Sequence, residues 1–82
     1  MLVVPNPVTS SATLFLDNPV EGQITLRTMD ASGRIVHELR QVNSVGQNRL
    51  EFPVAVLEPG SYFLQVLDAN GDVVGRVPFV RQ

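Results

Sequence analysis

Short runs of alternating apolar and polar residues recur along this chain. In the clearest run, Tyr62, Leu64 and Val66 fall on one face and the residues between them on the other, because successive side chains of a strand point to opposite sides. No stretch repeats its apolar residues at the spacing of three or four that marks a helix. The pattern predicts seven strands, at residues 2–4, 11–16, 23–29, 35–41, 48–52, 61–66 and 73–80.

The apolar faces of these runs predict a single core. The run at 35–41 is the ambiguous one, because Val36 and Leu39 differ in parity and would point to opposite faces of a regular strand. A β-bulge would bring both residues to one face. The side chains that we expect to share the core are Leu14, Leu26, Leu50, Tyr62, Leu64 and Val66.

Turn residues separate the runs at regular intervals. Gly33 and Gly71 are expected to have positive φ, because tight hairpins demand it, and the Asn70-Gly71 pair favours a type I′ turn. Pro78 lacks the N–H that a central strand needs, so the last run is expected at a sheet edge or bulge. Short strands with frequent turns predict an all-β, immunoglobulin-like β-sandwich of about seven antiparallel strands.

Tyr62 comes two residues after Gly60, just past the Pro59-Gly60 turn. In β-sandwiches a tyrosine at such a corner buries its ring, while its hydroxyl donates to a backbone carbonyl upstream. We therefore expect Tyr62 to fix the crossing between the two sheets.

Composition narrows the classes of function. The 82 residues are 44% hydrophobic and 17% charged, which suits one small domain with a core. The net charge of −2 argues against non-specific nucleic-acid binding. No run approaches the roughly 18 apolar residues of a membrane helix, so we expect no membrane insertion. We also expect the domain to be a monomer. Without cysteine or lysine, the chain offers no disulfide, thiolate metal site or Schiff base.

Candidate chemistry is sparse, and we expect neither an enzyme nor a cofactor. His37 is the single histidine, and an exposed position on a strand explains it better than a metal site or a catalytic triad. Asp68, Asn70 and Asp72 have the opening spacing of a calcium loop, but the rest of that pattern is missing. A tight turn explains these three residues better, and weak calcium binding stays open. Exposed apolar side chains could form a docking patch or lie scattered; they are Phe15, Met29 and Phe63.

Three stretches in order carry a family resemblance. They read Pro5-Asn6-Pro7, Asp30-Ala31-Ser32-Gly33-Arg34 and Leu57-Glu58-Pro59-Gly60-Ser61-Tyr62. Together they resemble the type A C-terminal sorting domain of the type IX secretion system, and the match covers nearly the whole chain. The residues that match the family's motifs are Pro5, Asn6, Pro7, Asp30, Gly33, Arg34, Leu57, Gly60 and Tyr62.

The resemblance implies a recognition module. Residues 1–82 would be a single C-terminal sorting domain taken from a longer secreted protein. Its partners would be the type IX translocon and sortase components. The cargo would pass through the periplasm of a Gram-negative bacterium and be secreted or held at the cell surface; whether the domain is then cleaved off stays open. We expect the last strand to carry the signal, through Arg76, Val77, Phe79, Val80 and Arg81.

A passive immunoglobulin-like or fibronectin-like spacer is the alternative, as is a carbohydrate-binding module of a secreted hydrolase. Carbohydrate modules usually present an aromatic platform. This chain has no tryptophan, one tyrosine and four phenylalanines, so it offers little material for one.

Overall fold

The computed structural model describes residues 1–8, 10–18, 22–43 and 46–82. Seven strands and no helix occur in these residues. The strands are β1 (Leu2–Val4), β2 (Ser11–Asn18), β3 (Gly22–Asp30), β4 (Ile35–Asn43), β5 (Gly46–Pro53), β6 (Gly60–Leu67) and β7 (Val73–Arg81). Each predicted strand is present. All but the first extend by one or two residues at an end, because backbone pairing continues beyond the alternating side chains.

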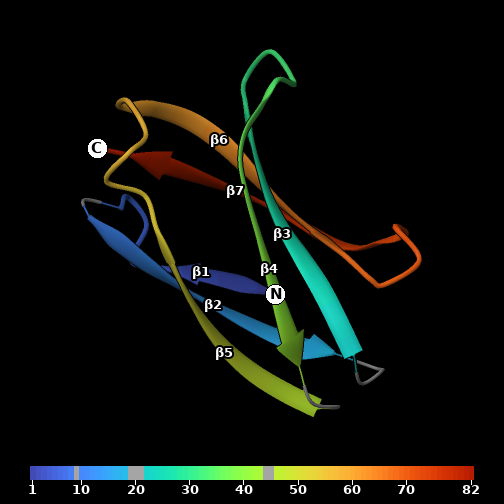
Figure 1. Ribbon diagram of the computed structural model, residues 1–82. Coiled ribbons are helices and arrows are strands. Elements are labelled where there is room, and N and C mark those ends of the chain that lie inside the picture. The colour runs from blue at the N-terminus through green and yellow to red at the C-terminus, as the bar shows by residue number, and fades with distance from the viewer. Residues whose placement is uncertain (9, 19–21, 44–45) are drawn as a thin grey trace.

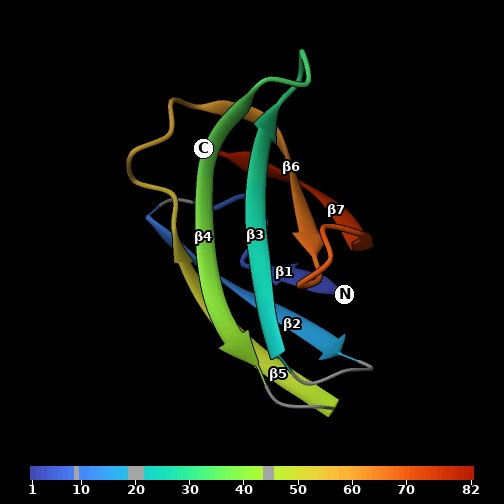
Figure 2. The same ribbon diagram turned by 45° about the vertical axis from the view of Figure 1, so that its right-hand side comes forward.

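The strands form two sheets, with the orders β1-β2-β5 and β4-β3-β6-β7 (Figures 1 and 2). Every pair of neighbouring strands is antiparallel. The chain changes sheet between β2 and β3, between β4 and β5, and again between β5 and β6. Such crossings are typical of immunoglobulin-like sandwiches. The predicted all-β sandwich is confirmed, and β7 lies at the edge of the larger sheet, as Pro78 requires.

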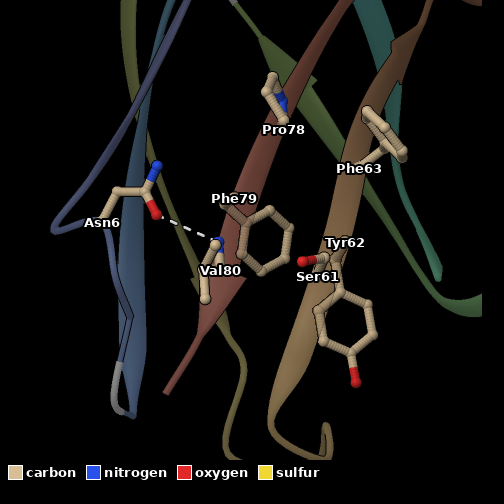
Figure 3. Close-up of a pocket in the computed structure, with 7 residues that line it drawn as sticks. All are labelled: Asn6, Ser61, Tyr62, Phe63, Pro78, Phe79 and Val80. Carbon is tan, nitrogen blue, oxygen red and sulfur yellow. Dashed lines mark hydrogen bonds between the residues drawn. The ribbon is translucent and has the colours of Figure 1, made fainter. Parts of the chain in front are cut away.

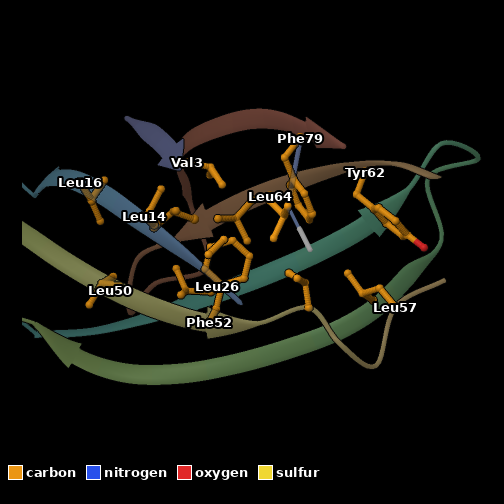
Figure 4. Packing of buried hydrophobic residues seen from close by; sticks show 14 of the residues in the cluster. Val3, Leu14, Leu16, Leu26, Leu50, Phe52, Leu57, Tyr62, Leu64 and Phe79 are labelled. Carbon is orange, nitrogen blue, oxygen red and sulfur yellow. The ribbon is translucent and has the colours of Figure 1, made fainter. Parts of the chain in front are cut away.

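Side chains from the inner faces of both sheets fill the space between them (Figure 4). All six residues that we expected to share the core are buried, with exposed fractions of 8% or less. Phe79 of β7, only 2% exposed, joins them. Its ring lies against Tyr62 and Phe52. The edge strand β7 is thus tied to the core by one large aromatic side chain.

A bulge in β4 settles the ambiguous parity. Thr28 pairs with His37 and the next residue, Met29, pairs with Ile35, so Val36 is the extra residue on β4. Both Val36 and Leu39 then pack against the core, partly buried. The bulge that the sequence suggested is therefore confirmed, and it lies one residue into the strand.

The β3–β4 and β6–β7 hairpins have three-residue loops of one design. In each, the glycine N–H donates to the carbonyl of the aspartate that opens the loop, over 3.0 Å for both Gly33 to Asp30 and Gly71 to Asp68. The predicted positive φ is confirmed, at 89° for Gly33 and 84° for Gly71.

The type I′ prediction for the second hairpin is wrong. A type I′ turn needs positive φ at both central residues, and no described residue other than glycine has positive φ, so Asn70 does not. The carboxylate of Asp68 accepts hydrogen bonds from the N–H groups of Asn70 and Asp72, at 2.9 and 3.0 Å. These contacts are those of a three-residue loop that ends in a left-handed glycine.

Candidate functional site

The three motifs of the sequence come together at one end of the sandwich. Asp30, at the end of β3, pairs with Tyr62 near the start of β6. Gly60 pairs with Arg81 at the end of β7. The Pro5-Asn6-Pro7 segment, with two cis X-Pro peptide bonds, follows β1 and lies beside the same end of β7 (Figures 1 and 3). We call this region the motif end; it surrounds the last residues of β7.

The N-terminal motif caps the outer edge of β7. The side-chain oxygen of Asn6 accepts a hydrogen bond from the N–H of Val80 at 3.0 Å (Figure 3). Val8 donates its N–H to the Val80 carbonyl at 2.7 Å and accepts one from the N–H of Gln82 at 2.8 Å. Val8 therefore forms a parallel bridge with Arg81, and its own side chain is completely buried.

Tyr62 forms the predicted corner. Its hydroxyl donates to the carbonyl of Glu58 at 2.5 Å, which fixes the path of the chain between β5 and β6. Its ring stacks on Phe79, with centroids 5.6 Å apart and planes at 21°. Phe52 meets Phe79 edge-on at 5.9 Å. The third motif thus supports β7 from inside the core.

Asp30 orders the tip of the β3–β4 hairpin. Its carboxylate accepts hydrogen bonds from the Ser32 hydroxyl at 2.6 Å and from the N–H groups of Ser32 and Arg34, both at 3.0 Å. The Nε of Arg34 completes the set at 3.2 Å. The Ser32 hydroxyl, followed by the Arg34 N–H, lowers the pKa of Asp30. The tip shares a small polar hollow with Leu57 and Tyr62, so the second motif adjoins the third.

The five residues predicted for recognition occupy different environments in β7. Arg76 is exposed and lies over the ring of Phe63, with 4.2 Å from its guanidinium carbon to the centroid. Val77 packs partly buried against the core, and Val80 is 44% exposed. Phe79 is a core residue, so its side chain is not available at the surface of the folded domain.

Arg81, the fifth of these residues, is held within the domain. Its Nε donates to the carbonyl of Val54 at 3.1 Å, on the crossing that follows β5, and its Nη1 donates to the carbonyl of Gln82. Arg81 is therefore only partly exposed, whereas no described carboxylate pairs with Arg76.

An apolar row crosses the outer face of the larger sheet and was not foreseen. Register places Ile35 opposite Met29, Met29 opposite Phe63, and Phe63 opposite Pro78. Beside Pro78 and Phe63 lies an open depression of about 380 Å³, which Asn6, Ser61 and Val80 help to line (Figure 3). Each of the four strands contributes one residue to the row, so the row can be recognised only once the register of the strands is known. Two members of the suspected docking patch, Met29 and Phe63, meet in this row.

The remaining aromatic residue of that patch lies elsewhere. Phe15 is on β2 in the smaller sheet, with Arg49 over its ring at 5.8 Å. Since Arg76 covers Phe63 in the same manner, both accessible phenylalanine rings carry a guanidinium on one face. The other three aromatic side chains are buried.

Structural roles explain the positions of the residues that were candidates for metal binding or acid–base chemistry. His37 lies on β4 as expected but is half-buried rather than exposed. Asp68 directs one carboxylate oxygen to the backbone of its own loop. Among the described residues, no three histidine, cysteine, aspartate or glutamate side chains come close enough to hold a metal ion. In the same residues no helix is long and apolar enough to cross a membrane.

Comparison with known proteins identifies the family. No curated protein and no solved structure matches the chain. The family model described as the secretion system C-terminal sorting domain matches residues 2–78, which is nearly the whole chain and includes all three motifs. Such domains direct export to the cell surface or secretion in Gram-negative bacteria, through interaction with the type IX secretion machinery. The chain therefore belongs to the type IX secretion C-terminal sorting domain family.

Proposed function

We propose that the type IX machinery recognises this sorting domain at the motif end, and that the final strand β7 is the element it contacts. One observation carries the proposal: two of the three family motifs, distant in sequence, bear directly on the last residues of β7, and the other adjoins them through the pairing of Asp30 with Tyr62. Asn6 binds the backbone of Val80, Tyr62 supports Phe79 from the core, and Gly60 pairs with Arg81. A domain built to present a short strand would use its motif residues in this way.

The predicted recognition residues then divide into two roles. Arg76 offers a partner an exposed cation, and Val80 offers an exposed apolar side chain. No described carboxylate forms an ion pair with Arg76, so no ion pair has to break before a partner binds. Val77, Phe79 and Arg81 position the strand through the core and through Val54. Arg76 and Val80 would thus determine which partner binds, and the other three residues would hold β7 in the position that the partner recognises.

The wider route follows from the same proposal. Residues 1–82 act as one domain at the C-terminal end of a larger cargo protein, and the cargo reaches the periplasm before the domain is read. A sortase then removes the domain and joins the cargo to surface lipopolysaccharide. The support for these steps is family membership alone.

The experiment is a reporter fused in front of the domain, in a host that has a type IX system. The intact fusion should reach the surface or medium, whereas deletion of Arg76–Gln82 should leave the reporter in the periplasm. Arg76→Ala should lower export severalfold. Arg49→Ala is the matched control, because Arg49 likewise lies over a phenylalanine ring, that of Phe15, but on the opposite sheet. Export of this control should equal that of the parent.

Two outcomes would contradict the proposal. Equal export of the intact and the deleted fusion would make the domain a passive spacer. Equal losses for Arg76→Ala and Arg49→Ala would mean that surface charge in general matters, and not the contact at β7. A tag placed after Asn70, in the exposed loop between β6 and β7, tests cleavage separately, because it should be missing from cargo isolated at the surface.

A further inference from the structure

The outer edge of β7 is already occupied where the strand ends. In an antiparallel ladder, alternate residues direct their N–H and C=O groups to the same side. Val80 directs both groups away from β6, to Asn6 and Val8, and the N–H of Gln82 also reaches Val8. The segment Asn6–Val8 therefore takes the place that an added strand would take, running parallel to β7.

Further back along β7, β1 lies nearby and the Met1 side chain packs against Gly75, but the backbone groups on the same edge of β7 have no hydrogen-bond partner there among the described residues. By the same alternation, Pro78 and Arg76 also direct their backbone groups away from β6. Pro78 has no N–H, and at this position an N–H would point away from β6. The missing donor therefore weakens pairing with strands of other molecules but removes no hydrogen bond from the sheet. The Arg76 N–H and the carbonyls of Arg76 and Pro78 have no partner in the described parts of the chain.

We propose that the outer edge of β7 is a strand-addition site for an extended polypeptide segment of the export machinery, and that Asn6–Val8 fills it as a placeholder until that segment binds. The inference rests on the proposed function and specifies how β7 is read. The incoming segment would repeat the three contacts of the placeholder and continue over Pro78 and Arg76, which the placeholder leaves open. Strand addition of this kind draws affinity from main-chain hydrogen bonds and specificity from side-chain pockets.

The placeholder indicates what its competitor must look like. Val8 is completely buried, so the competitor needs a branched apolar side chain at the same place. The N–H of Val80 needs an acceptor, which Asn6 now supplies. Arg76 adds an unpaired positive charge beside the open part of the edge, so an acidic residue at that end of the segment would strengthen binding. The proposed partner is thus an extended, apolar segment with an acidic end.

Hydrogen exchange on the purified domain tests the placeholder directly. Asn6→Ala removes the acceptor for the Val80 N–H and should raise exchange at Val80 and Gln82 by about five- to tenfold, the effect of losing one net hydrogen bond. Asn6→Asp keeps an acceptor oxygen and should exchange like the parent. Leu64 in the core exchanges by global opening, so its change measures the loss of overall stability with which the changes at Val80 and Gln82 are compared. If exchange at Val80 and Gln82 does not respond to Asn6→Ala, the placeholder is refuted.

A disulfide lock tests its displacement. Val8 and Arg81 are bridge partners, and the natural chain has no cysteine, so Val8→Cys with Arg81→Cys introduces one defined bond. The oxidised fusion should stay in the periplasm, and the same fusion kept reduced should be exported severalfold better. Thermal unfolding of both purified forms checks that each is folded. If the two cysteines impair folding, the exchange measurement alone decides.

The results separate the two proposals. If the locked fusion is exported as well as its reduced form, while deletion of Arg76–Gln82 still blocks export, β7 is read without strand exchange and only the placeholder is wrong. If the deletion also has no effect on export, the recognition of β7 fails with it.

Discussion

The corner tyrosine allows the contribution of one hydrogen bond at the motif end to be separated from that of ring packing. Tyr62→Phe removes the hydroxyl that donates to Glu58 and keeps the ring stacked on Phe79. Loss of one neutral hydrogen bond should lower the free energy of unfolding by about 0.5–1.5 kcal/mol. Tyr62→Ala removes the ring as well and should cost about 3–5 kcal/mol. For a domain of this size the total is roughly 4–12 kcal/mol, so the second change removes at least about a quarter of the stability.

Urea denaturation followed by far-ultraviolet circular dichroism measures both changes. With a slope of about 1 kcal/mol per molar urea for a small domain, Tyr62→Phe should lower the midpoint by about 0.5–1.5 M. Phe15→Leu, at a partly exposed ring on β2, is the control and should shift the midpoint little. A midpoint for Tyr62→Phe equal to that of the parent would refute the corner argument. Equal losses for Tyr62→Phe and Tyr62→Ala would refute the role of ring packing.

Three more changes test the core, a turn and a titrating group. Leu64→Ala, at a completely buried position, should cost about 2–5 kcal/mol in urea melts, whereas Val42→Ala, at an 82% exposed position, should stay within about 0.5 kcal/mol. Gly71→Val forces a branched side chain to a φ of 84° and should cost about 1–3 kcal/mol by thermal unfolding, with Gly71→Asn milder; equal losses would contradict the turn argument. Because folding lowers the pKa of Asp30 from 3.8, the stabilising contribution of its carboxylate is complete above about pH 4–5 and is lost as the pH falls through the folded pKa. Asp30→Asn should therefore flatten the fall in the free energy of unfolding at acid pH, and an unchanged fall would contradict this role of Asp30.

Local patterns in the sequence foretold the features that depend on local geometry. Alternation alone placed Leu14 and Leu64 in the core, since a strand has only two faces. The parity conflict between Val36 and Leu39 marked the bulge. The type of the second hairpin turn was missed because the Asp68 carboxylate, and not the Asn-Gly pair, determines the backbone there.

The candidate site was harder to foresee because its contacts join distant residues. Asn6 was singled out as a motif residue, yet nothing local says that its side chain binds the backbone of Val80, 74 residues further on. Phe79 alternates correctly for a core position, but it was expected only among the recognition residues of the last strand, and its side chain is buried. The contact of Arg81 with the Val54 carbonyl depends on how the two sheets meet.

The bridge between Val8 and Arg81 also affects when the domain can finish folding during biosynthesis. The β3–β4 and β6–β7 hairpins close short loops and can form as soon as they emerge from the ribosome, since the entropy cost of closing a short loop is small. The bridge joins residues at opposite ends of the described chain, so it must wait for nearly all of it to be synthesised. A nascent chain that stops before Phe79 lacks both the aromatic stack and the partner of Asn6. A chain that ends before Phe79 therefore cannot assemble the motif end, however well its first six strands fold.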